Sequence, residues 1–274
     1  MDASISRANI EQAALLIDPV FLNTPQFDCE PLSARLGVTT ILKVETVNPI
    51  RSFKGRGTDY LLHRLPADGK AMVCASAGNF GQGMAYACRK AGRRLTVFAA
   101  TTASPIKVER MRALGAEVIE EGSDFDEAKA AARRHAGDHD AFYVEDGLLG
   151  PIAEGAGTIA LELTRTETLL DAIFIPLGNG SLINGMGTWL RHASPATRVI
   201  GVCAQAAPAM ERSWNAGSPI TTASATIADG IAVRVPVPEA LELMRGVVDE
   251  VMLVSEDEIV AAMRVLFADS GLIV

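Results

Sequence analysis

Short apolar runs, many of them β-branched, alternate along this chain with longer alanine-rich stretches that favour helices. Each apolar run has the length of a strand, and such alternation is typical of a mostly parallel sheet with helices on both faces. We therefore predict an α/β fold. The predicted strands are residues 39–47, 72–75, 95–100, 116–121, 172–178, 198–204 and 249–255.

Two helix starts are marked by their capping residues. Ser104 precedes Pro105, which combines a hydroxyl that can cap a helix with a proline suited to the first turn. We expect that helix to end at Gly115. Ser255 and Glu258 have the spacing of a capping box, which predicts another helix directly after the last strand.

The spacing of the strands divides the chain. Between about residues 72 and 147 the strands follow one another closely, as in a compact βαβαβ unit inserted into a larger one. We predict a small domain at 72–147 and a large domain made of residues 1–71 and 148–274, with a cleft between them. The sequence has no internal repeat or proline-rich linker, so only the order of elements indicates these boundaries.

Composition indicates where in the cell this fold is expected and whether it needs disulfides or zinc. An apolar fraction of 49% in 274 residues is ample for a buried core. Charges at Asp2, Arg7 and Glu11 argue against a signal sequence, and no apolar run reaches membrane-spanning length. The four cysteines lie far apart without a CxxC pair, which favours neither disulfides nor zinc and fits a reducing cytoplasm: Cys29, Cys74, Cys88 and Cys203.

The net charge limits the class of partner. At −8 it argues against nucleic acid, because neutralisation of phosphates supplies most of the affinity of nucleic-acid-binding proteins. The sequence also gives no reason to expect a membrane partner. We therefore expect a cytoplasmic protein that binds a small molecule.

Lys54 stands in the string NPIRSFKGRG, where it opens a predicted helix. A lone lysine after a serine and an aromatic residue is usually an ordinary surface residue. Here two glycine-bearing loops follow it along the chain. Partial burial, the positive end of a helix dipole and a nearby Arg51 or Arg56 would all favour the neutral, nucleophilic amine that an aldehyde requires.

The first of these loops, SAGNFGQG at 76–83, joins a predicted strand to a predicted helix. It could be no more than a glycine-rich turn. Its small residues, however, leave backbone N–H groups free to bind a substrate carboxylate, and the Asn79 amide can donate a hydrogen bond to a ring hydroxyl.

The second loop, GNGSLING at 178–185, follows a strand and opens a helix, so its amides can bind a phosphate. The alternative is a dinucleotide loop, but the spacing is not GxGxxG and no acidic residue ends the next strand. A bare phosphate suits it better. Together, one amine and two such loops are what an enzyme needs to hold pyridoxal phosphate (PLP) by its aldehyde, ring and phosphate.

Five strings in order, SFKGRG, SAGNFGQG, EGAGTIALEL, GNGSLING and TIADGIAV, resemble the fold type II PLP enzymes, in their threonine/serine dehydratase and serine racemase branch. The resemblance covers nearly the whole chain. It implies two α/β domains, each a mostly parallel sheet flanked by helices, with PLP in the cleft between them. It also implies a Schiff base on Lys54, a ring flanked by Phe53 and a hydrogen bond from Asn79 to the 3-hydroxyl.

The same resemblance implies roles for the loops. Gly230 would lie near the cofactor. The phosphate would be held by the backbone of Gly178, Asn179, Gly180, Ser181 and Leu182, and the substrate carboxylate by Ser76, Ala77, Gly78, Asn79 and Phe80.

The reaction implied is β-elimination, in which L-threonine or L-serine loses water and then ammonia to give a 2-oxo acid; members of the family generally form homodimers. Three alternatives stay open. They are β-replacement by a sulfur nucleophile, a threonine synthase-like reaction, and a catalytically silent homologue that binds PLP or an amino acid as a sensor.

Several positions depart from the family pattern. Racemases of this branch carry a hydroxyl where Ala77 stands, which disfavours racemisation, and their cation site has Gln205 here in place of an acid, so we predict no required metal. Asn179 and Ser181 replace glycines of the phosphate loop, and the chain stops at Val274, before the motif that faces the pyridine nitrogen in relatives. Asp146 and Glu154 are expected to flank the cleft in structural roles.

Overall fold

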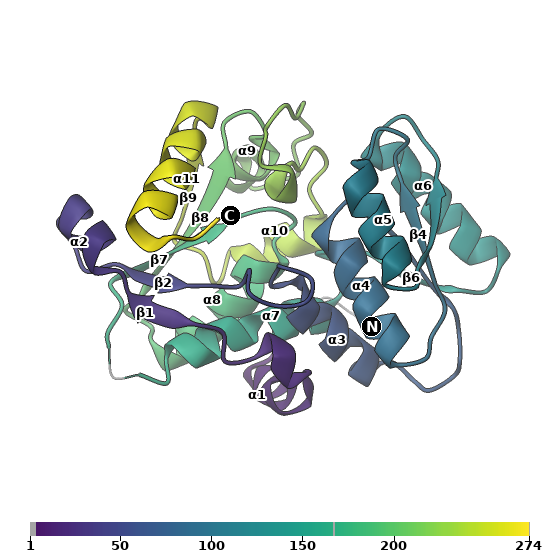
Figure 1. The fold of residues 1–274 in the computed structure, drawn as a ribbon, viewed down its shortest axis with the longest axis horizontal. Coiled ribbons are helices and arrows are strands. Elements are labelled where there is room, and N and C mark those ends of the chain that lie inside the picture. Colours follow the sequence, from purple (N-terminus) through teal and green to yellow (C-terminus); the bar gives the residue numbers. More distant parts are fainter. Residues whose placement is uncertain (1–3, 167, 274) are drawn as a thin grey trace.

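The structure is a computed structural model that describes residues 4–166 and 168–273. Figure 1 shows its helices packed around separate sheets. The helices are α1 (Arg7–Leu16), α2 (Glu30–Leu36), α3 (Lys54–Arg64), α4 (Asn79–Lys90), α5 (Pro105–Ala113), α6 (Phe125–Asp138), α7 (Gly150–Leu163), α8 (Ser181–Ala193), α9 (Ala209–Ala216), α10 (Pro238–Met244) and α11 (Glu256–Ser270), with 3-10 turns η1 (Pro19–Phe21) and η2 (Asp229–Ile231). The strands are β1 (Gln26–Asp28), β2 (Ile41–Lys43), β3 (Met72–Ala75), β4 (Leu95–Ala99), β5 (Glu117–Glu120), β6 (Phe142–Val144), β7 (Ala172–Pro176), β8 (Arg198–Ala204) and β9 (Glu250–Val254).

A four-stranded parallel sheet has the order β5-β4-β3-β6 and lies on the right in Figure 1. Every residue of β3 is buried, because helices cover both faces of the sheet. Cys74 and Val97 pack with Met84 of α4 and Met111 of α5 on one face. On the other face, Val73, Ala75 and Phe98 pack against the alanines of α6.

A three-stranded parallel sheet has the order β7-β8-β9 and lies on the left in Figure 1. Ile175, Val199 and Val251 come from its three strands and share one cluster with Ile183 and Leu190 of α8. The α/β class with parallel sheets flanked by helices is thus confirmed. The division into domains at 72–147 and on either side of it stays a prediction.

Residues 39–47 differ from the expected strand. Only Ile41–Lys43 is extended, and it pairs antiparallel with β1 in a separate ribbon. The remainder turns away because Asn48 organises a loop: its side-chain oxygen accepts from the backbone N–H of Ile50 and Ser52, and its amide donates to the carbonyl of Glu45. This loop leads directly to α3.

Both helix-start predictions hold, with one difference in detail. Ser255 and Glu258 form the complete capping box. Helix α5 begins at Pro105 as expected and is followed by Gly115 in the left-handed region, but the Ser104 side chain makes no capping hydrogen bond. Proline at the first position already lacks one of the N–H groups that a cap would satisfy.

Helices α3, α7 and α8 pack with their backbones close together. A Cβ at Gly185 of α8 would lie 1.9 Å from the carbonyl oxygen of Ala153 in α7, and a Cβ at Gly57 of α3 would lie 2.3 Å from that of Ile152. Only glycine permits these approaches. The contacts fix the starts of α3 and α8 relative to each other.

Candidate functional site

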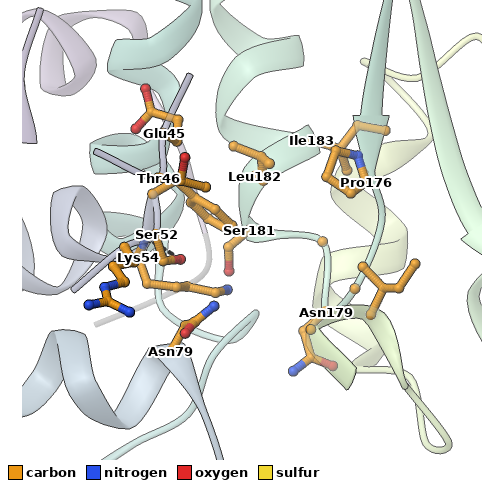
Figure 2. A pocket seen from close by; sticks show the side chains of 16 residues that line it. Glu45, Thr46, Ser52, Lys54, Asn79, Pro176, Asn179, Ser181, Leu182 and Ile183 are labelled. Atoms are coloured by element: carbon orange, nitrogen blue, oxygen red, sulfur yellow. Dashed lines mark hydrogen bonds between the residues drawn. The ribbon is translucent and has the colours of Figure 1, made fainter. Parts of the chain in front are cut away.

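The loops singled out in the sequence meet at one pocket (Figure 2). It lies where the β2–α3, β7–α8 and η2 loops come together with the start of α4. All the residues expected to bind the cofactor line it: Phe53, Lys54, Asn79, Gly178, Asn179, Gly180, Ser181, Leu182 and Gly230. These residues come from four segments that are far apart in the sequence.

Lys54 is the first residue of α3, and its side chain extends toward the space between Ser181 and Asn79 (Figure 2). Its Nζ lies 2.7 Å from Oδ2 of Asp146, 4.7 Å from the centre of the Phe53 ring and 5.9 Å from that of Phe80. Only 14% of the lysine side chain is exposed. The amine is thus accessible from the pocket and shielded elsewhere.

Three helices begin at this pocket. Lys54, Asn79 and Ser181 are the first residues of α3, α4 and α8, and all three line it. The residue before each is a phenylalanine or a glycine, and neither side chain can accept a hydrogen bond from the helix. The N–H groups of Lys54 and Gly81 donate to the hydroxyls of Ser52 and Ser76. The other N–H groups of these first turns and the positive ends of the helix dipoles favour an anion here.

The 178–180 loop depends on glycine. A Cβ at Gly178 would lie 2.9 Å from the carbonyl oxygen of Gly230, so the η2 loop packs directly against it. Gly180 has a φ of +90°, a conformation that L side chains rarely adopt. Asn179 and Ser181, which replace family glycines, lie at positions that tolerate a side chain.

In the 76–80 loop, the hydroxyl of Ser76, a residue expected to bind a substrate carboxylate, accepts hydrogen bonds within the loop. Ser76 is buried, and its Oγ accepts hydrogen bonds from the backbone N–H groups of Gly78 and Gly81 at 3.1 and 2.9 Å. Asn79 lines the pocket, whereas its neighbours in the loop do not: Ser76, Ala77, Gly78 and Phe80. The role of this loop in binding a substrate carboxylate stays a prediction.

Arg56 does not face the Lys54 amine, contrary to one of our expectations. It is fully buried and hydrogen-bonds both oxygens of Glu162 at 2.6 and 3.0 Å and both oxygens of Glu45 at 2.8 and 2.9 Å. Burial alone would raise the pKa of Glu162, but hydrogen bonds from Arg56 and Lys43 hold it below its ordinary value. Arg56 therefore ties α3 to Glu45 and to Glu162 of α7.

Sequence reasoning missed the contact role of Asp146. The residue follows β6, and its carboxylate pairs with Lys54 through Oδ2 while its Oδ1 accepts a hydrogen bond from Ser181 Oγ at 2.7 Å. The available signal was an acidic residue just after a strand end, but β6 is three residues long and was not predicted. Glu154, paired with it in our expectation, contacts Asn9 and Arg64 instead.

Comparison with known proteins identifies the family. A family model described as "Pyridoxal-phosphate dependent enzyme" matches residues 17–274. The chain belongs to this family. The matched span includes every residue placed at the pocket above.

The relatives of the chain in this family include threonine dehydratases. An L-threonine dehydratase of Pasteurella multocida is 35% identical over 247 residues, which are 89% of this chain and 48% of the relative. An L-threonine ammonia-lyase of Geobacter sulfurreducens is 36% identical over 248 residues, which are 88% and 61%. The chain spans about half the length of the curated relatives it matches.

Solved structures share the fold. The processed threonine deaminase isoform 2 of Solanum lycopersicum matches with a TM-score of 0.90 at 29% identity, covering 100% of this chain and 80% of that one. A PLP-dependent aspartate racemase matches with 0.89 at 26%, covering 99% and 86%. These findings confirm the resemblance to fold type II PLP enzymes of the threonine dehydratase branch.

The pocket fits the cofactor of the family. It offers a partly buried amine at Lys54, an amide at Asn79 and the backbone at the start of α8, which follows the Gly178–Gly180 loop. An aldehyde, a ring hydroxyl and a phosphate are the groups that these three features can bind.

The described residues contain no group of three histidine, cysteine or acidic side chains that could hold a metal ion. Glu211, the acid that remains at the family cation position, accepts a hydrogen bond from Asn215. Our prediction that no metal is required stays a prediction. In the same described part of the chain, none of the helices has the length and apolarity needed to cross a bilayer.

Proposed function

We propose that this chain is a PLP-dependent lyase that removes water and ammonia from L-threonine or L-serine, giving a 2-oxo acid. The observation that carries the proposal is the convergence of every expected cofactor residue on one pocket that contains the Lys54 amine. The names of the relatives, threonine dehydratase and L-threonine ammonia-lyase, favour the same reaction.

Each wall of the pocket has a task in this reaction. Lys54 would bond the cofactor aldehyde and, once released, take the proton from the substrate Cα through Nζ. The backbone at Gly178–Leu182 would hold the phosphate, Asn79 would orient the ring and Phe53 would lie against it. The cofactor, when bound, supplies a conjugated ring that spreads the negative charge left at Cα.

The substrate would enter beside the 76–80 loop. Backbone N–H groups at the start of α4 favour its carboxylate, and the position of Ala77 offers no hydroxyl for a second proton transfer. A lyase is therefore favoured over a racemase, although serine racemases share the fold.

Lys54→Ala tests the proposal. The purified wild-type protein, supplied with PLP, should convert L-threonine to 2-oxobutanoate and show the visible absorbance of a lysine-bound cofactor. Lys54→Ala should lose both, with a fall in rate of at least about 10³-fold. Lys70→Ala, which removes a surface lysine paired with Asp140, is the matched control and should keep both.

Product analysis separates the alternatives. If wild-type protein releases 2-oxobutanoate only in traces but consumes an activated serine derivative together with sulfide, β-replacement is the reaction. If Lys54→Ala keeps the absorbance and the activity, the proposal is wrong.

We further propose a cytoplasmic homodimer whose small domain, residues 72–147, and large domain, residues 1–71 and 148–274, hold PLP in the cleft between them. The four cysteines are free and buried, and burial raises the pKa of Cys88 and Cys203 to about 12, so these two thiols stay protonated at neutral pH. Sedimentation velocity of the purified protein tests the dimer, for which a monomer at micromolar concentration would be the contrary result.

A further inference from the structure

Asp146 touches two of the groups that PLP would need. Its carboxylate lies 2.7 Å from Lys54 Nζ through one oxygen and 2.7 Å from Ser181 Oγ through the other. The side chains of Asp146 and Lys54 are 12% and 14% exposed, so the ion pair is largely shielded from water. One acidic side chain thus links the starts of α3 and α8.

The backbone holds Asp146 in this place. The next residue, Gly147, has a φ of +90°, and a Cβ there would lie 2.5 Å from the carbonyl oxygen of Asn179. The loop after β6 therefore packs directly against the 178–180 loop. This contact fixes the backbone next to Asp146 against the loop that precedes Ser181.

Charge and hydrogen bonding make this contact compete with the cofactor. The Asp146 carboxylate holds the Lys54 amine at 2.7 Å, and this charge-assisted contact must break before the amine can reach an aldehyde. The same negative charge lies one hydrogen bond from the first residue of α8, where a phosphate would bring further negative charge. Both effects oppose loading of PLP.

We infer that Asp146 is a positioning residue for Lys54: whenever the lysine amine is not bonded to the cofactor, Asp146 holds it, and Ser181 holds Asp146. This inference rests on the proposed function of Lys54. It has two consequences of opposite sign. Asp146 slows loading, because its contact with Lys54 Nζ must break before the amine and the aldehyde join with loss of one water. It speeds turnover, because it stabilises the ammonium that forms when Lys54 takes the Cα proton.

The first test follows loading by absorbance. Cofactor-free protein is mixed with PLP at neutral pH, and the growth of the lysine-bound absorbance band is recorded for wild type and Asp146→Asn. Asparagine keeps the shape and can still accept from Ser181, but it removes the charge. We expect loading to be about tenfold faster in Asp146→Asn, because an uncharged amide holds Nζ more weakly than a carboxylate does. Asp140→Asn, which breaks the exposed ion pair with Lys70, is the matched control and should load like wild type.

The second test uses the loaded proteins. With L-threonine, Asp146→Asn should turn over at least about tenfold more slowly at saturating substrate, whereas a merely structural role would slow both loading and turnover. Loading at or below the wild-type rate would overturn the inference, and so would unchanged turnover. If wild-type protein forms no lysine-bound band at all, the proposed function fails first, so the two failures are distinguishable.

Discussion

Four charged side chains meet in the interior behind α3. Arg56 and Lys43 supply two positive charges, and Glu45 and Glu162 supply two negative ones, with side-chain exposures of 15% or less. Buried ions are tolerated when they are paired and hydrogen-bonded, but the loss of one partner leaves another without compensation. The stability of the pocket wall thus depends on this charge balance.

Glu162→Gln tests that balance and its pH dependence. We expect the variant to lower the free energy of unfolding by about 3 kcal/mol at neutral pH. The pKa of Glu162 is lowered from 4.5 in the folded protein, so its stabilisation is present above about pH 4.5 and is lost as the pH falls through the lowered value. The gap between wild type and variant, measured by urea denaturation at about pH 7, 5 and 4, should therefore shrink only at the most acidic point.

Glu120→Gln is the matched control for this experiment. Glu120 pairs with Arg112 at 2.8 Å on the surface, where both side chains are about two-fifths exposed. The control should change the free energy of unfolding by less than about 1 kcal/mol at every pH. Equal losses for the two variants would contradict a special role for the buried network.

Residue chemistry was partly predictable from sequence. Lys54 and the glycine loops stand in strings whose chemistry is local, so their pocket positions could be anticipated. Arg56 and Asp146 could not, because their roles depend on partners more than 90 positions away in the chain, Glu162 and Lys54. An alternating pattern says nothing about such pairing.

Among the elements, the crossing of α7 and α8 places the tightest limit on side-chain size. Gly185 approaches the backbone of Ala153, and Gly157 approaches that of Gly185 in return. Two helices this close cannot slide to admit a methyl group, because both also pack against the core around Ile10 and Met186. This contact fixes the position of the start of α8, where Ser181 lines the pocket.

Gly185→Ala should therefore destabilise the protein by about 3 kcal/mol or prevent folding, since the added Cβ has backbone and not a flexible side chain in its way. Gly137→Ala in α6 is the control, because nothing lies within 4 Å of its Cβ position. That variant should gain about 0.5–1 kcal/mol from the higher helix propensity of alanine. Thermal unfolding of both measures the contrast, and similar melting temperatures would refute it.

Element prediction succeeded where burial is continuous. Strands such as β3, β4 and β8 are buried along most of their length, which leaves a clear apolar run in the sequence. β1 and β6 were not predicted, and β2 was predicted too long; each has only three residues and is partly covered. β1 and β2 pair with each other and β6 pairs with β3, and no single-segment pattern reveals such pairing.

At the scale of the whole molecule, ion pairs connect the loop around η2 to helices of the four-stranded sheet. Lys107 of α5 pairs with Asp229, and Arg234 pairs with Asp124 at 2.7 Å and with Asp126 at 3.6 Å. The loop carries Gly230 into the pocket. The loop that lines the pocket through Gly230 is thus held by charged residues of α5 and of the start of α6, two helices that flank the four-stranded sheet.

Arg234→Ala tests this connection. Removal of the guanidinium should increase amide hydrogen exchange in residues 222–233 by about three- to fivefold, as expected for the loss of an exposed ion-pair network. Wild type in about 1 M salt should approach the variant, because salt screens exposed pairs. Arg134→Ala breaks a pair with Glu121 elsewhere on the surface and should leave this loop unchanged. Exchange that is indifferent to both salt and the variant would argue against the connection.

The attachment of the η2 loop has a practical consequence for anyone who handles this protein. Buffers of high ionic strength, routine in purification, would loosen the wall beside Gly230 and let a bound cofactor escape during chromatography. Preparations made at low ionic strength should retain more of the visible absorbance of bound PLP. Helices α5 and α6 contribute no residue to the pocket lining, yet substitutions of their charged residues should also change how much of that absorbance is retained.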